Sequence, residues 1–227
     1  MKILIIADEE SKSLWDFYTP EKLAGVDLII SCGDLKAEYL EFLVTMSTAR
    51  LLYVPGNHDT KYTTHPPEGC ENIDGKVFTF GGIRFFGLGG SMKYGVEPYM
   101  YTEKEMRKKI WHSKVSLINN AGFDVLVTHS PARGYGDMDD LPHIGFDCFN
   151  DLLEKWKPGY MFYGHVHSTY SHGKFERQMS HPSGTKLINA FGSYEFEIGE
   201  DEYPAVGQTG SFLYDLVMTL KDKKRKT

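Results

Sequence analysis

One pattern recurs along the chain: a short apolar run, too compact for a helix, ends directly in polar residues of the kind that bind metal ions. It occurs five times in 227 residues, and helical patterns separate the runs. Such runs are typical of buried parallel strands, and the carboxyl ends of parallel strands lie at one edge of a sheet. We therefore expect the five polar clusters to converge on one crevice.

Each cluster stands at the same position relative to its apolar run. In chain order they are Asp8 with Glu10, Gly33 with Asp34, residues 56–59 (GNHD), residues 128–130 (THS) and residues 164–167 (GHVH). Alone, each has an ordinary explanation, because Gly-Asp and Gly-Asn pairs are common in turns and a single histidine is more often hydrogen-bonded than metal-bound. Their conjunction favours one site for divalent ions such as Mn, Fe or Zn.

Helices and further strands account for the rest of the chain. Helical patterns span residues 36–49, 102–118 and 149–157, and a hairpin pattern spans residues 76–90. Thr102 and Glu105 form a predicted capping box, and Pro158 ends the third helix. Residues 184–198 and 210–218 predict more strands. These segments indicate two sheets stacked face to face with helices outside both.

Composition bounds the alternatives. With 41% hydrophobic and 14% aromatic residues the chain can bury one large core, so we expect a single domain over residues 1–220 and a frayed basic tail over 221–227. The net charge of -6 argues against a nucleic-acid groove. No apolar run reaches the length of a signal peptide or membrane span, which predicts a cytoplasmic protein. Three cysteines without CxxC spacing indicate free thiols.

The motifs GD at 33–34, GNHD at 56–59, TH at 128–129 and GHVH at 164–167 together resemble the calcineurin-like metallophosphoesterases over nearly the whole chain. The resemblance implies an α/β fold, a four-layer α/β/β/α sandwich with two central mixed sheets, and a dinuclear metal centre that hydrolyses a phosphate ester. It also implies the ligands. The first ion would take Asp8, the residue at position 10, Asp34 and His167, and the second would take Asp34, Asn57, His129 and His165, with Asp34 bridging.

General chemistry agrees with this allocation, because two divalent ions about 3.5–4 Å apart can clamp the attacking and leaving oxygens of a displacement. A metal-bound hydroxide would be the nucleophile. His58 is our candidate to protonate the leaving oxygen. Asp59 either orients His58 or is a plain carboxylate after a turn.

The chain departs from the family pattern at Glu10, where the family has histidine. A glutamate ligand would add a third carboxylate to the centre and favour hard ions, so we expect two divalent ions with Mn or Fe preferred and Zn acceptable. Glu10 either ligates the first ion or turns to solvent, leaving that ion weakly bound.

Substrate contacts are less specified. Arg133 either pins a phosphate oxygen or forms an exposed salt bridge, and His143 stands in an acidic loop close to the histidine clusters. Tyrosines at 94, 99 and 101 either stack on a substrate or pack beneath a loop. We predict a phosphoesterase acting on a small phosphate ester, with phosphodiesterase favoured over phosphomonoesterase. The alternative is a protein-interaction scaffold with a weakened site. The sequence does not specify the oligomeric state.

Overall fold

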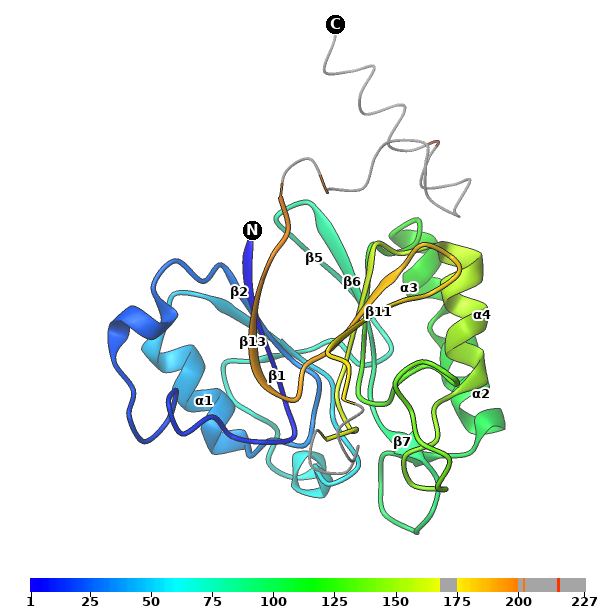
Figure 1. Ribbon diagram of the computed structural model, residues 1–227, viewed down its shortest axis with the longest axis horizontal. Coiled ribbons are helices and arrows are strands. Elements are labelled where there is room, and N and C mark those ends of the chain that lie inside the picture. Colours follow the sequence, from blue (N-terminus) through cyan, green and yellow to red (C-terminus); the bar gives the residue numbers. More distant parts are fainter. Residues whose placement is uncertain (168–174, 200–201, 203–215, 217–227) are drawn as a thin grey trace, which may run out of the picture.

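The structure is a computed structural model that describes residues 1–167, 175–199, 202 and 216. The predicted strand at 210–218, apart from Leu216, and the predicted basic tail at 221–227 lie outside these residues. Two large sheets pack face to face, and helices cover the outer side of each sheet (Figure 1). The predicted four-layer α/β/β/α sandwich with two mixed sheets is confirmed.

The first sheet has the strand order β13-β1-β2-β3-β4. Its strands are β13 (Gly192–Glu197), β1 (Lys2–Ala7), β2 (Leu28–Ser31), β3 (Arg50–Tyr53) and β4 (Glu71–Asn72). Strands β1 to β4 pair in parallel, and β13 pairs with β1 in the antiparallel sense. The carboxyl ends of β1, β2 and β3 therefore lie at the same edge.

The second sheet has the order β11-β12-β10-β9-β6-β5. Its strands are β11 (Gln178–Ser180), β12 (Lys186–Asn189), β10 (Tyr160–Tyr163), β9 (Val125–Thr128), β6 (Ile83–Leu88) and β5 (Val77–Phe80). The four central strands are parallel and the two outer strands antiparallel. The predicted hairpin is confirmed, since Gly81 and Gly82 both take the positive φ that a two-residue β5–β6 turn requires.

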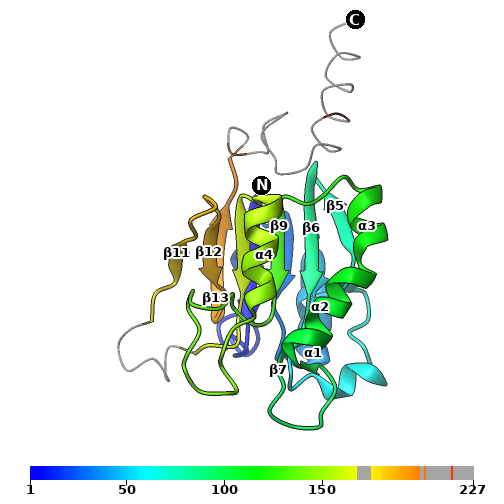
Figure 2. The same cartoon turned by 90° about the vertical axis from the view of Figure 1, so that its right-hand side faces the viewer.

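Helix α1 (Ala37–Met46) and the short 3-10 helices η1 (Pro20–Leu23) and η2 (Thr60–Thr63) accompany the first sheet. Helices α2 (Glu103–His112), α3 (Lys114–Asn119) and α4 (Asp147–Trp156) cover the second sheet (Figure 2). A small two-stranded sheet pairs β7 (Ser91–Met92) with β8 (Met100–Tyr101). The predicted capping box at Thr102 is present. The helix predicted over 102–118 is interrupted at Ser113, whose hydroxyl donates to the Lys109 carbonyl.

Strand β1 explains why its run is apolar throughout. Ile3 and Ile5 enter the core between the two sheets, and Leu4 and Ile6 enter the core beneath α1. A third core lies between the second sheet and its helices. Because both faces of each central strand are buried, the strand ends that carry the polar clusters are held by packing on two sides.

The cysteines and the helices bear on two further predictions. Cys32, Cys70 and Cys148 are unpaired thiols, as predicted. Among the described residues, no helix has the length and apolar character needed to cross a bilayer.

Candidate metal centre

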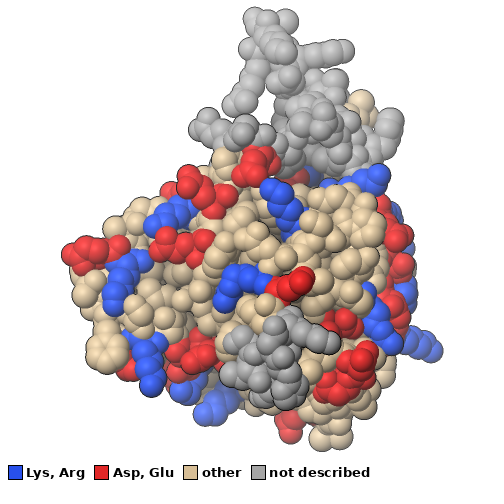
Figure 3. Space-filling view, viewed as in Figure 1, with Lys and Arg blue, Asp and Glu red and all other residues tan. Residues whose placement is uncertain are grey.

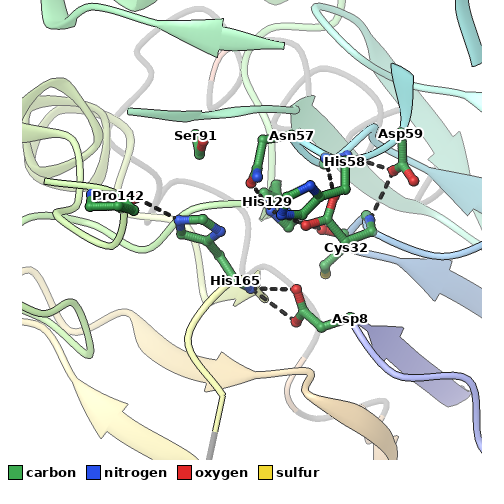
Figure 4. Close-up of polar contacts among 12 residues, drawn as sticks. Asp8, Cys32, Asn57, His58, Asp59, Ser91, His129, Pro142 and His165 are labelled. Atoms are coloured by element: carbon green, nitrogen blue, oxygen red, sulfur yellow. Dashed lines mark hydrogen bonds and ion pairs between the residues drawn. The ribbon is translucent and has the colours of Figure 1, made fainter. Parts of the chain in front are cut away.

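The five polar clusters meet at one edge of the sandwich, as the sequence predicted. Asp8, Asp34 and Asn57 follow β1, β2 and β3 of the first sheet, and His129 and His165 follow β9 and β10 of the second. Figure 4 shows the side chains of Asp8, Asn57, His129 and His165 gathered in one region at these strand ends. Asp34, His129 and His165 each offer a ligand atom, and these atoms all lie within 4.8 Å of one another.

Backbone strain is concentrated in these residues. Asp8, Asp34 and His165 have φ of 66°, 58° and 70°, in the left-handed region that side chains rarely adopt. Each such conformation costs on the order of 1 kcal/mol or more in a residue other than glycine. Tyr99, Ala121 and Lys157 also have positive φ, so half of the described non-glycine residues in this conformation lie at the strand ends.

Glycines let the motif loops approach one another closely. A Cβ at Gly33 would lie 2.4 Å from the Gly56 nitrogen, and a Cβ at Gly56 would lie 2.1 Å from Asp34 Oδ1. A Cβ at Gly164 would lie 2.7 Å from Asp8 Oδ2. All three distances are too short for a Cβ atom, so the glycine of each motif is required by the close approach of another motif.

His129 is oriented toward two oxygens that a metal ion could share. Its Nδ1–H donates to the Cys32 carbonyl at 2.7 Å, so Nε2 faces the site. There Nε2 lies 2.9 Å from Asn57 Oδ1 and 3.3 Å from Asp34 Oδ2. Burial disfavours the charge on His129, but Asp34 outweighs it and raises the pKa of His129 to about 9.

The raised pKa means that His129 Nε2 carries a proton between the Asn57 and Asp34 oxygens at pH 7. Burial also opposes ionisation of Asp34, yet the His129 cation and the backbone N–H of His58 lower the pKa of Asp34 to about 2. The His58 N–H donates to Asp34 Oδ1 at 2.7 Å. Three donors of the types that hold divalent metals thus surround one position, and the residues fit a metal ion.

His165 completes this group with a fixed tautomer. Its Nε2 lies 2.7 Å from the Pro142 carbonyl, which only accepts, so Nε2 carries the proton and Nδ1 keeps its lone pair. Burial, reinforced by the charge of His129, lowers the pKa of His165 to about 3. The His129 and His165 rings lie 4.8 Å apart. His165 is thus neutral and ready to ligate at any pH near 7.

Asp8 and His167 form the other half of the site. Asp8 Oδ1 lies 3.5 Å from His167 Nε2, and both Asp8 oxygens accept from the backbone N–H of His165, at 3.0 and 2.9 Å. Glu10 is engaged elsewhere: its carboxylate lies 3.1 Å from Lys36 Nζ and accepts weakly from the Lys36 N–H at 3.4 Å. The first ion's predicted ligands are thus partly assembled, and Glu10 is paired with the exposed side chain of Lys36.

His58 and Asp59 play different structural parts. His58 is exposed beside Asp34. Asp59 is buried, and its Oδ2 accepts from the backbone N–H groups of Asp34 and Gly56 at 2.8 and 2.7 Å. Burial and the nearby Asp34 charge raise the pKa of Asp59 to about 7. Asp59 therefore joins two ligand loops, and its bonds go to backbone rather than to the His58 ring.

Of the two predicted substrate residues, His143 lies at the site, whereas Arg133 forms no hydrogen bond with the proposed ligands among the described residues. His143 lies at the site, with its ring 5.1 Å from that of His165 and its Nδ1 2.6 Å from Asp140 Oδ2. The hydrogen bonds of Arg133 involve its backbone with Phe146 and Asn150, and within the described chain none joins it to the proposed ligands.

Among the tyrosines, Tyr94 reaches the centre because its hydroxyl accepts from Asn57 Nδ2 at 2.9 Å. Tyr99 and Tyr101 pack against the cores. Two carbonyl contacts, from Cys32 and Pro142, were not foreseen. The position of Cys32 directly before Gly33 was a usable signal, whereas nothing in the sequence indicated that Pro142 returns to His165.

Comparison with known proteins agrees with this geometry. The sequence profile of the family described as Calcineurin-like phosphoesterase matches residues 1–169. The uncharacterized protein MJ1162 of Methanocaldococcus jannaschii is 31% identical over 157 residues, which cover 63% of this chain and 70% of that protein.

Solved structures give a more distant likeness. One chain at 14% identity superposes with a TM-score of 0.59, covering 86% of this chain and 93% of its own length. A structure reported as that of a novel archaeal phosphodiesterase shares 18% identity, with 65% of this chain and 86% of its own length covered, and its TM-score is 0.32. On the family match, the chain belongs to the calcineurin-like phosphoesterases and is a metal-dependent phosphoric ester hydrolase.

Proposed function

We propose that this enzyme hydrolyses a small phosphodiester, in preference to a phosphomonoester, at a centre of two divalent ions, with Mn or Fe preferred and Zn acceptable. The observation that carries the proposal is the position of His129 Nε2, which faces the oxygens of Asp34 and Asn57. A divalent ion at this position would be bound by the imidazole nitrogen, the amide oxygen and the carboxylate together.

Residues of both sheets would hold the ions. Asp34, Asn57, His129 and His165 would bind one ion, and Asp8, Glu10, Asp34 and His167 the other. Bound there, the metals would supply Lewis acidity and a water of lowered pKa. The protein fixes the ligand geometry through the Cys32 and Pro142 carbonyls, which set the histidine tautomers, and through Asp59, which ties the loops of Asp34 and Asn57.

His58 is the proposed proton donor to the leaving oxygen. The His58 residue is exposed, and its backbone N–H donates to Asp34 Oδ1. The imidazole is therefore placed next to the proposed reacting position without being a predicted ligand. Asp59 contributes indirectly, by joining the loop that carries His58 to the loop that carries Asp34. It is a positioning residue in this proposal.

The charge around the site supports the preference for a diester. The loop that supplies Pro142 and His143 also carries Asp137, Asp139 and Asp140. A diester brings one negative charge to this loop and a monoester up to two, so electrostatic repulsion favours the diester. His143 and Tyr94 are proposed to contact the substrate, and Arg133 is retained as a more distant candidate. The proposed cytoplasmic location rests on the three unpaired thiols.

Hydrolysis of an aryl phosphodiester by the Mn-loaded protein tests the proposal, with an aryl phosphomonoester run in parallel. Asp34→Asn is the control, because it removes the bridging carboxylate but keeps the shape of the side chain. We expect turnover in wild type, a higher kcat/KM for the diester, and loss of at least about a thousandfold in the variant. No turnover with any divalent metal would contradict the proposal and favour the scaffold alternative.

A further inference from the structure

Helices α2, α3 and α4 lie on the outer face of the second sheet (Figure 2), and residues of all three helices line a hollow there. It is a groove of about 490 Å³. Ile110, Leu117 and Leu152 line its floor, and Trp111, Ile118 and Trp156 line its walls. None of these residues is a proposed metal ligand, so the groove has no part in the hydrolytic reaction.

The exposed apolar residues on this face are clustered rather than scattered. Trp111 is 60% exposed, Val115 68% and Ile118 59%, although each is large and apolar. Trp111 and Ile118 both line the groove, and Val115 lies between them in the sequence. A single exposed apolar residue needs no explanation, but large exposed apolar residues that line the same groove are typical of an interaction site.

The rim of the groove is basic. Lys114 Nζ lies 5.6 Å from the centre of the Trp111 ring, and Lys155 Nζ lies 5.3 Å from that of Trp156. Within the described chain neither ammonium forms an ion pair, whereas Arg107 at one end is neutralised by Glu103 and Asp151. Two free cations thus flank an apolar groove in a protein whose net charge is -6.

The walls of the groove are also fixed before any partner arrives. Glu103 of α2 accepts from the first N–H groups of α4, Asp147 N at 3.2 Å and Cys148 N at 2.9 Å. Arg107 bonds both Glu103 and Asp151 and so links the same two helices. A preformed groove loses little entropy on binding.

From these observations we infer that the groove binds an amphipathic helical segment of a partner protein, with acidic residues flanking an apolar face. Such a helix would place apolar side chains at helical spacing between Trp111 and Trp156, and its carboxylates would meet Lys114 and Lys155. A second copy of this chain is a poorer occupant, because a two-fold interface would set the basic rims against each other.

The probe is a pair of labelled helical peptides that share one Leu/Phe face and carry either Glu or Lys at the flanking positions. Fluorescence anisotropy measures their affinity for the full chain. We expect the Glu peptide to bind, with affinity falling as salt is added, and the Lys peptide to bind at least about tenfold more weakly. Trp111→Ser should weaken the Glu peptide by at least about tenfold, as expected for a central aromatic anchor.

Phe17→Ser is the matched control, since Phe17 is equally exposed but lies outside the groove. It should bind the Glu peptide as wild type does. Both variants change surface residues, so melting temperature and phosphodiester hydrolysis verify that they remain folded. Equal binding of the two peptides, no binding of the Glu peptide, an unchanged affinity in Trp111→Ser, or a dimer in sedimentation that Trp111→Ser dissociates would overturn the inference.

Discussion

In His129, the location of a single proton distinguishes the metal-free site from the metal-bound site. Without metal, Nδ1–H is committed to the Cys32 carbonyl and the Nε2 proton lies between Asn57 and Asp34. A metal ion must displace that second proton. His165, whose pKa is lowered to about 3, has no proton to release from Nδ1.

We therefore predict that metal binding releases close to one proton from His129 at pH 7. Because the metal-free pKa is about 9, apparent affinity should rise by up to about tenfold per pH unit below pH 9 and level off above it. Calorimetry of Mn binding in two buffers of different ionisation enthalpy measures the released proton. His129→Gln, which keeps an oxygen ligand, should lose this release, and an unchanged release in that variant would refute the assignment.

The ion pair between Glu10 and Lys36 bears on binding of the first ion. If Glu10 is to ligate the first ion it must leave Lys36, so the lysine competes with the metal. We expect Glu10→Ala to weaken binding of the first ion by about tenfold or more and Lys36→Ala to strengthen it. Mn titration with metal analysis measures both. Wild-type affinity at both positions in both variants would show that Glu10 is not a ligand.

The residue types of the site were predictable from sequence because five clusters stood in one position relative to five runs. Asp8, Asp34, Asn57, His129 and His165 all lie at the expected edge. The sequence could not supply the contacts that orient these side chains. The bond of His165 to Pro142 depends on how a loop distant in sequence returns over the site, and the Glu10–Lys36 pair depends on where α1 begins.

At the scale of elements, the loops after β2 and β3 are shaped by contacts that exclude side chains. Gly56→Ala would bring a Cβ to 2.1 Å from Asp34 Oδ1 and so displace the bridging carboxylate. We predict a loss of about 1–3 kcal/mol in the free energy of unfolding and a loss of metal binding. Urea unfolding and Mn titration measure these effects.

Gly159→Ala is the matched control, since its Cβ would meet nothing closer than 3.9 Å and its φ is not in the left-handed region. It should keep wild-type metal affinity. If Gly56→Ala bound metal as well as Gly159→Ala, the close packing of the two loops would not be what positions Asp34.

The strand runs were predictable because continuous apolar sequence requires burial on both faces, which β1 has. For the segment at 184–198 the sequence predicted strands but not the sheets to which they belong. It forms two strands that belong to different sheets, β12 in the second and β13 in the first. β12 is buried over most of its length, whereas β13 alternates between half-buried and exposed residues. Neither pattern specifies the sheet, so only tertiary pairing assigns the two strands.

At the scale of the whole molecule, the proposed metal centre takes its ligands from both sheets. On the face seen in Figure 3 positive and negative side chains are interspersed without a dominant patch, and a hydrophobic core joins the two sheets. A ligand that binds only the folded protein stabilises it by about 2.7 kcal/mol at a hundredfold excess over Kd. For a chain of this size that corresponds to roughly 5–10 °C in melting temperature.

We predict that Mn raises the melting temperature by that amount and that a chelator reverses the change. Differential scanning calorimetry of wild type and Asp34→Asn measures it, and the variant should show little of the shift. A rise of the same size in Asp34→Asn would mean that the ion binds away from the strand ends.

The central claim is that strand ends from both sheets form one metal centre, which Asp34 bridges. Anomalous diffraction from crystals soaked in Mn tests this most directly. We expect two peaks about 3.5–4 Å apart, one on either side of the Asp34 carboxylate. One peak should lie toward His129 and His165, and the other toward Asp8 and His167. Peaks that lie away from Asp34, or a saturated crystal with no peak at the strand ends, would contradict it.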